Sequence, residues 1–446
     1  MMSPRISPSE FRRRRAALMS MMSPGSIAVI PAAGQKVRNR DTEYLFRQDS
    51  DFYYLTGYLE PEAALVLAPG REHGEVIVFC RERDARSELY SGERLGPDRA
   101  AQVLGVDDAF PANDIDDILP GMLEGRERIY ITLGEYPEFD NKLMHWVSNI
   151  RARESGGAIP PGEFVALKHL LHERRLVKSA AEIRIMREAA RITCQAHERA
   201  MLKCRPGMTE TQLEAELVHE FMINGAKTTA YPSIVGGGAN ACVLHYVDNS
   251  DVLHEGDLVL IDAGCELEQY ASDVTRTFPV GGTFSETQRA LYEIVLEANE
   301  HAIAACAPGV AFTEPHQVAL RIMVRGLLDL HLLDGDLEEI IATESYRLLC
   351  PHNTSHWLGL DVHDVGDYRV DGAWRELEPG MVLTIEPGIY IPRHELTSHF
   401  ADDWRGLGIR IEDDVLITKT GAEVLTAALP KSVTDIENLM RTSSGD

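Results

Sequence analysis

The spacing of apolar positions changes near residue 175, and this change predicts two structural units. Before it, apolar runs of strand length alternate with segments that have helical spacing. The predicted strands of this part are residues 26–30, 63–67, 75–79 and 128–132. We therefore predict an α/β domain over residues 1–175. Residues 154–162, which are rich in Gly and Pro, predict a loop, and residues 164–176 predict a helix that leads into the second unit.

The second unit, residues 176–446, is predicted to begin with capped amphipathic helices. Capping-box patterns, each followed by apolar residues at helical spacing, occur at Ser179–Glu182, Thr209–Gln212 and Ser285–Gln288. A further helix is predicted from about Thr313, with Pro315 in its first turn. Little periodicity follows Pro430, so we expect the tail to be peripheral.

Strand-like runs follow each pair of predicted helices in the second unit. They lie at residues 241–247, 258–261, 274–280, 356–362, 381–385 and 408–412. The order helix, helix, strands occurs twice at an offset of about 105 residues, which is typical of a duplicated half-domain. We predict an α+β unit with pseudo-two-fold symmetry, in which His245 lies opposite His356.

The N-terminal segment superficially resembles a signal peptide, because Arg12–Arg15 precede a short apolar run. Ser20 and Pro24 interrupt that run, and Ser7–Glu10 has the pattern of a capping box with Pro8 at the first helical position. We therefore predict a surface helix here.

Composition narrows the classes of function. The chain has 44 Lys+Arg and 70 Asp+Glu, a formal net charge of −26, which disfavours nucleic acid as a partner. No apolar run approaches the ~20 residues that span a bilayer, so we expect no membrane partner. The seven cysteines are odd in number and contain no C-x-x-C pair. This pattern is typical of reduced thiols and predicts a cytoplasmic protein.

Four carboxylates stand at the ends of strand-like runs, where an unpaired charge is costly. They are Asp262, Asp273, Glu386 and Glu412. One such residue alone would be interpreted as facing water or pairing with Arg276 or Arg410. Four in matching positions favour a site that contains positive charge, because buried carboxylates must be paired or bind metal.

Histidines beside the candidate strands supply the remaining ligand type. They are His245, His352, His356 and His363. His352 and His356 have the i, i+4 spacing of helical zinc sites, but the residues between them are poor helix formers and H-E-x-x-H is absent. Four carboxylates with one histidine favour two divalent ions of the manganese type over zinc. Paired metals bridged by carboxylates are the usual hydrolytic arrangement.

Other catalytic and binding motifs are weak in this sequence. Gly236–Gly238 with Ala241 fits G-x-G-x-x-A, but the residues that follow predict a strand and not the helix of a dinucleotide site. No G-K-[ST] and no G-x-S-x-G motif occurs. Nucleotide binding and serine hydrolysis are therefore disfavoured.

An ordered series of motifs resembles a known family, the pita-bread metallopeptidases, and is most similar to its aminopeptidase P branch. The motifs are Val235–Gly238, Leu244–Tyr246, Ile261–Gly264, Ser272–Pro279, Ser355–Asp364, Thr384–Tyr390 and Ile409–Asp414. Upstream, Phe46–Gly57 resembles the N-terminal domain of that branch. The resemblance implies an α+β pita-bread catalytic domain at 176–446 with pseudo-two-fold halves, preceded by a smaller α/β domain at 1–175.

The resemblance also implies roles for individual residues. The implied ligands of two divalent ions, expected to be Mn²⁺, are Asp262, Asp273, His356, Glu386 and Glu412, with Asp273 and Glu412 bridging. Glu386 would also carry the proton to the leaving nitrogen. The residues implied to contact substrate are His245 and His363, which hold the substrate and transition state, and His352, Tyr368 and Arg410, which shape the proline side of the cleft.

The implied activity is release of the first residue from peptides whose second residue is proline, by a homo-oligomer, either tetramer or dimer. Two alternatives stay open. One is a prolidase that accepts only Xaa-Pro dipeptides, and the other is a pita-bread binding module without activity. All five ligand positions are occupied, which favours activity. Tyr90 stands where the family has Trp, so specificity at the rim of the site stays open.

Overall fold

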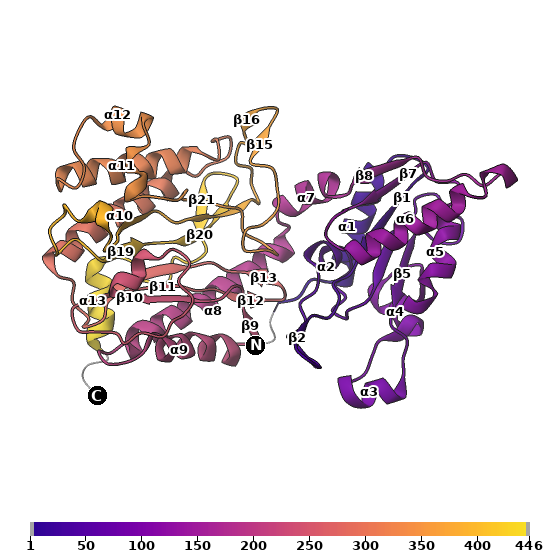
Figure 1. Ribbon diagram of the computed structural model, residues 1–446, viewed down its shortest axis with the longest axis horizontal. Coiled ribbons are helices and arrows are strands. Elements are labelled where there is room, and N and C mark those ends of the chain that lie inside the picture. Colours follow the sequence, from indigo (N-terminus) through magenta and orange to yellow (C-terminus); the bar gives the residue numbers. More distant parts are fainter. Residues whose placement is uncertain (1–3, 443–446) are drawn as a thin grey trace. The chain divides into compact units, whose positions relative to one another are not determined.

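The computed structural model of the protein describes residues 4–442 (Figure 1). Contacts divide these residues into two compact units, Ile6–Arg175 and Leu176 onward, and Arg5 is assigned to the second. Within residues 4–442, no helix has both the length and the apolar character that crossing a membrane requires. All seven cysteines are free thiols.

The first unit is built on a mixed sheet of order β6-β5-β4-β1-β7-β8. Its strands are β1 Ser26–Pro31, β4 Ala64–Leu67, β5 Val76–Cys80, β6 Asp108–Pro111, β7 Arg128–Ile131 and β8 Glu163–Ala166. The four predicted strands form the centre, since strands covered on both faces have continuous apolar sequences. Strand β1 runs antiparallel to β4 and parallel to β7.

The helices of this unit lie around the sheet, except for Ala85–Ser91, which lies apart from it and buries no residue (Figure 1). They are α1 Pro8–Met21, α2 Ser50–Thr56, α3 Ala85–Ser91, α4 Gly96–Leu104, α5 Ile115–Leu123, α6 Pro137–Arg151 and α7 Lys168–Leu176, and a small hairpin is formed by β2 Val37–Asn39 and β3 Thr42–Glu43. Leu119 of α5 and Trp146 of α6 pack into one apolar core with Ile27 and Ile129 of the sheet. Removing these side chains from water stabilises the unit.

Two sequence predictions for the first unit need correction. Residues 164–166 belong to the edge strand β8, which pairs with β7, so the helix begins only at Lys168. Helix α1 forms as predicted, but without its capping box, because the Ser7 hydroxyl bonds to that of Ser9 and Glu10 pairs with Arg13. Arg15 is buried and donates to backbone carbonyls of residues 55, 104 and 105, which are far from it in sequence.

The second unit has the predicted helices. They are α8 Ala180–Lys203, α9 Glu210–Ile223, α10 Glu286–Ala305 and α11 Glu314–Asp329. Two more helices, α12 Leu337–Ala342 and α13 Val433–Thr442, were not predicted. The capping boxes at Ser179, Thr209 and Ser285 are all formed. Each box satisfies two backbone N–H groups that helix geometry leaves without partners, which fixes where the helix begins.

Short sheets lie between these helices. Their strands are β9 Thr228–Thr229, β10 Ile234–Gly237, β11 Leu258–Asp262, β12 Cys265–Leu267, β13 Tyr270–Ala271, β14 Thr275–Pro279, β15 Arg369–Val370, β16 Ala373–Trp374, β17 Val382–Ile385, β18 Gly388–Ile391, β19 Leu407–Arg410, β20 Asp413–Ile417 and β21 Ala422–Val424. The two main sheets have the orders β10-β11-β14 and β17-β20-β21.

The two halves of this unit repeat one strand arrangement. In the first half, β11 pairs antiparallel with β14, and β10 lies on its other edge. In the second half, β17 pairs antiparallel with β20, and Trp357 forms a bridge on the other edge of β17. The predicted duplication of strand order is therefore present, with β21 added at one end.

The predicted place of His245 within this repeat is wrong. Ile234 lies opposite Asp262, and Thr354 accepts the N–H of Glu386 in the corresponding position of the second half. His356 stands two residues after Thr354, so its counterpart in the first half is Gly236 and not His245. His245 lies in a turn that follows the 3-10 helix η3 Gly238–Cys242.

Three segments differ from their predicted structure. Residues 241–247 form the end of η3 and a turn, because Asn240 bonds to Glu210 and Asp251 and folds the chain back. Residues 356–362 are irregular apart from the bridge at residue 357. The tail is not peripheral, since Lys431 bonds to Asp413 and helix α13 buries apolar side chains.

Candidate metal centre

The four strand-end carboxylates reach one place because antiparallel pairing brings strand ends together. Strands β11 and β14 pair antiparallel. Asp262 ends β11, and Asp273 lies two residues before β14. Glu386 directly follows β17, and Glu412 lies between β19 and β20. The strand end is thus where each backbone leaves its sheet and points a carboxylate into the space between the halves.

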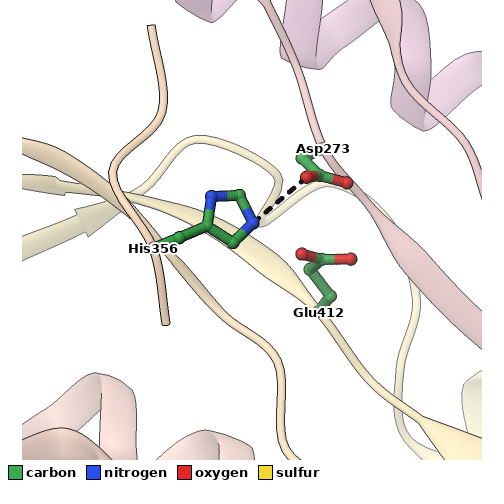
Figure 2. Close-up of side chains that lie close together, drawn as sticks. All are labelled: Asp273, His356 and Glu412. Atoms are coloured by element: carbon green, nitrogen blue, oxygen red, sulfur yellow. Dashed lines mark ion pairs between the residues drawn. The ribbon is translucent and has the colours of Figure 1, made fainter. Parts of the chain in front are cut away.

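Asp273, His356 and Glu412 form the centre of the cluster (Figure 2). One ligand atom of each lies within 4.8 Å of the others, and within residues 4–442 no other group of three such side chains does so. His356 Nε2 is 3.4 Å from Asp273 Oδ2 and 3.4 Å from Glu386 Oε1. The arrangement therefore joins four of the five predicted ligands around one imidazole nitrogen.

Asp262, the fifth predicted ligand, is held by an arginine and a tyrosine. Arg410 Nη2 is 2.5 Å from Asp262 Oδ2. The Tyr231 hydroxyl lies 2.6 Å from Asp262 Oδ1 and also within hydrogen-bond distance of Asp273, so it donates to one of them at a time. Tyr231 was not predicted from the sequence, because it lies in a short loop without periodicity.

The negative charge of the clustered carboxylates exceeds the positive charge that neighbouring side chains supply. Burial and the neighbouring carboxylates raise the pKa of Glu412 well above its usual value. Burial is also the largest cause that raises the pKa of Glu386 to about 7. Burial lowers the pKa of His356, but its bonds to Asp273 and the charge of Glu386 more than offset this and raise it to about 9. The cluster therefore takes up protons or other positive charge.

This donor set fits divalent cations. It offers four carboxylates and one imidazole, an oxygen-rich set that hard cations prefer. His356 Nδ1 donates to the carbonyl of Trp357 at 3.0 Å, which turns Nε2 toward the carboxylates. Hydroxyl groups of Thr275 and Thr384 donate to Glu412 at 2.6 Å and to Glu386 at 3.3 Å, which orients the two carboxylates.

His363 lies beside His356, and His245 is close enough to influence it electrostatically. The ring of His363 lies 4.4 Å from that of His356, nearly perpendicular to it. Burial and the charge of His356 lower the pKa of His363, and His245 adds a smaller contribution of the same sign. His245 itself is exposed. A neutral imidazole at residue 363 can donate to or accept from a bound molecule.

His352 and Arg410 are joined through Tyr390. Arg410 Nη1 donates to the Tyr390 hydroxyl at 2.8 Å, and that hydroxyl lies 2.8 Å from His352 Nε2. Burial and the charge of Arg410 lower the pKa of His352 to about 4, so it is neutral and Nε2 accepts from the hydroxyl. Tyr368 stacks on Trp357 and accepts its backbone N–H.

A buried ion pair behind Glu412 was not predicted. Asp413 Oδ1 lies 2.8 Å from Arg276 Nη2, and its other oxygen lies 2.8 Å from Lys431 Nζ. Arg276 Nη1 also donates to the carbonyl of Glu412 at 2.7 Å. Arg276 was predicted only as a possible partner for the candidate ligands. In the structure it pairs with Asp413 instead and holds the backbone of Glu412.

Comparison with known proteins agrees with this geometry. A family model described as metallopeptidase family M24 matches residues 184–419, and one described as the aminopeptidase P N-terminal domain matches residues 11–130. The chain belongs to metallopeptidase family M24. This confirms the predicted family and the predicted α+β pita-bread fold with a preceding N-terminal domain.

Relatives of this M24 chain are similar over nearly their whole length. Xaa-Pro aminopeptidase of Escherichia coli is 47% identical, over 98% of each chain. The structure of Pseudomonas aeruginosa aminopeptidase PepP has a TM-score of 0.97 and 56% identity, covering 99% of this chain and 100% of that one. Escherichia coli aminopeptidase P with the inhibitor Pro-Leu has a TM-score of 0.95 and 46% identity, covering 99% of this chain and 100% of that one.

Proposed function

We propose that this metallopeptidase is a dinuclear aminopeptidase that releases the first residue from peptides whose second residue is proline. The observation that carries the proposal is the convergence of Asp273, His356 and Glu412, with Glu386 at 3.4 Å from the same imidazole. Relatives at up to 47% identity over the whole chain carry the Xaa-Pro aminopeptidase name. A peptide bond before proline needs a dedicated site, because its nitrogen has no N–H and φ is fixed.

In this proposal two divalent ions, Mn²⁺ in the cell, occupy the cluster. The residues that would hold them are Asp262, Asp273, His356, Glu386 and Glu412, with Asp273 and Glu412 shared between the ions. When bound, such ions polarise a carbonyl and supply a nucleophilic oxygen at neutral pH. The donor set favours this pairing because its carboxylates lack enough protein cations to offset their charge.

The chain's own residues then divide the remaining work. Glu386, with a pKa raised to about 7 by burial in the metal-free protein, is placed to accept a proton and deliver it to the leaving proline nitrogen. His363 and His245 orient the substrate carbonyl from the side of His356. The chain from Arg410 through Tyr390 to His352, together with Tyr368, shapes the wall for the proline ring.

The prolidase alternative depends on what meets the carboxyl end of the substrate. A dipeptidase binds a carboxylate directly on the proline, so it needs an available cation there. Arg410 is 3% exposed and already bonds to Asp262, Tyr390 and Thr275. These bonds favour a structural role for Arg410 and, with it, an aminopeptidase that accepts longer peptides. The binding-module alternative is disfavoured because every proposed ligand position holds a ligating residue.

A peptide series with Mn²⁺ tests the proposed function. We expect Xaa-Pro-Xaa tripeptides and longer peptides to be cut at the Xaa-Pro bond, measured by chromatography of the released residue. Acetylation of the N-terminal amine should abolish cleavage, because the site must bind that amine to place the bond correctly. Turnover of Xaa-Pro dipeptides alone would favour the prolidase, and no turnover of any substrate would favour the binding module.

We also propose that the protein is a cytoplasmic homo-oligomer, either tetramer or dimer. Helix α3 has no buried residue, and Leu89 and Tyr90 on it are 81% and 84% exposed. Large apolar side chains that are exposed together mark interaction surfaces. Light scattering after size-exclusion chromatography measures the oligomer, and a monomer at micromolar concentration would contradict the proposal.

A further inference from the structure

A buried ion pair lies beneath the loop that carries His363. Residues 358–367 contain no helix or strand, yet the side chain of Asp364 is only 1% exposed. Its Oδ2 lies 2.9 Å from Nζ of Lys178, which is also 1% exposed and precedes helix α8. Desolvation makes such a pair weak evidence for stability, because apolar residues of similar size can replace it without loss. Its presence in an irregular loop therefore calls for another role.

The pair is connected to both histidines of the site through one carbonyl oxygen. The N–H of Asp364 donates to the carbonyl of Trp357 at 2.8 Å, and Nδ1 of His356 donates to the same oxygen at 3.0 Å. His363 directly precedes Asp364, and its ring lies 4.4 Å from that of His356. Fixing Asp364 therefore fixes the backbone of His363 relative to the oxygen that orients His356.

The backbone around the pair is also held by hydrogen bonds. The N–H of Lys178 donates to the carbonyl of Gly380 at 2.8 Å, and the carbonyl of Gly359 accepts the N–H of Ala271 at 2.8 Å. A Cβ atom on Gly359 would lie 2.1 Å from Asp364 Oδ2 and 2.9 Å from Lys178 Cε. The loop thus closes directly over the pair, and only glycine leaves room for it.

We infer that Lys178 and Asp364 are positioning residues that hold the His363 imidazole against His356 in the geometry that the reaction needs. This inference rests on the proposed function, in which His363 contacts the substrate. The pair itself lies outside the proposed ligand set. It acts through His363, so its loss should lower turnover while the metal-binding cluster stays intact.

The decisive variant is Lys178→Met with Asp364→Leu, which removes both charges and keeps the buried volume filled. We expect its unfolding midpoint and metal content to stay near those of the wild type, because both members of the buried pair are replaced together. We expect kcat to fall about tenfold or more, the size of effect that orienting residues have, with KM within about threefold. A double variant that folds stably and keeps the kcat of the wild type would overturn the inference.

Two further variants keep the test independent of folding. Gly359→Ala displaces the carboxylate without changing any charge, and we expect the same loss of kcat. Adding His363→Ala to the double variant should cause little further loss, because residues that act through one another are not additive. A fully additive loss would contradict the inference.

Matched measurements separate this inference from the proposed function. Arg175→Met removes a buried cation, 2.6 Å from Asp51, in the other unit, and we expect a lower unfolding midpoint with unchanged kcat. An equal loss of kcat in Arg175→Met would mean that Lys178 and Asp364 affect turnover only through the stability of the fold. That result would overturn the inference. If the wild type cuts no Xaa-Pro peptide, the proposed function itself fails before the variants are compared.

Discussion

Replacing Asp273 by Asn or Glu412 by Gln is expected to abolish peptide cleavage and remove bound metal while leaving the fold intact. Both carboxylates lie within 4.8 Å of the His356 nitrogen, and neutral amides bridge cations poorly. We expect kcat/KM to fall by about three orders of magnitude, or about 4 kcal/mol of transition-state stabilisation. Metal content by mass spectrometry and turnover of an Xaa-Pro-Xaa peptide are the two measurements.

The metal-free Glu412→Gln variant should unfold at a higher temperature than the metal-free wild type. Burial and neighbouring carboxylates raise the pKa of Glu412, which means that its charge is destabilised where it stands. A neutral side chain relieves that repulsion. Adding Mn²⁺ should then raise the unfolding midpoint of the wild type only, because a ligand stabilises the state that binds it.

Glu182→Gln is a suitable control for these variants. Glu182 is a buried carboxylate of the same unit, but it closes the capping box of α8 and lies outside the cluster. Glutamine can fill the same capping role, so metal content and turnover should stay unchanged. Full activity of the wild-type protein after exhaustive chelation would show that the cluster is not a metal centre.

The carboxylates of the site could be found from sequence because each one violates a local rule. Asp262 directly ends a fully apolar run, and Glu386 directly ends a run that is apolar apart from Thr384. A charge in that position needs an explanation wherever the strand lies. The strand pairs and capped helices were predictable for the same reason, since apolar spacing and capping boxes are read within a few residues. Local patterns therefore gave the candidate ligands and most of the elements that hold them.

The partners of those residues could not be found in the same way. Arg276 and Asp413 are 137 residues apart, and no periodicity connects them. Glu412 and Asp413 are adjacent and equally acidic, yet one faces the cluster and the other faces Arg276 and Lys431. Successive side chains in extended backbone point to opposite sides, so which of the two faces the metals depends on strand register.

The irregular segments were predicted least well. Residues 241–247 and 356–362 have apolar residues typical of strands, but Asn240 and the close approach of Gly359 to Asp364 turn the chain away from a ladder. Side-chain bonds to distant carboxylates decide these conformations. His245 and His363 lie on such segments, which is why their places relative to His356 could only come from the structure.

Arg276→Met is expected to cause the largest loss of stability of any single change in the second unit. Arg276 and Asp413 are completely buried, and the guanidinium also donates to the carbonyls of Glu412 and Pro430. Removing it leaves Asp413 with Lys431 and the Thr426 hydroxyl, and takes the guanidinium donor away from those carbonyls. Breaking a buried pair from one side costs about 3–5 kcal/mol, measurable by urea unfolding at pH 7. Lys431→Met should cost less, because Arg276 still pairs with Asp413.

The loss should depend on pH in a direction that the ion pair fixes. Burial raises the pKa of Asp413, but the charges and hydrogen bonds of Arg276 and Lys431 more than offset this and hold it well below its usual value. A depressed carboxylate pKa contributes stability above the unfolded value of about 3.9, and that contribution disappears as pH falls toward the folded value. The difference between wild type and Arg276→Met should therefore be constant near neutral pH and narrow below about pH 4. A difference that stays constant down to pH 3 would mean that the lost carbonyl bonds, and not the ion pair, account for the effect.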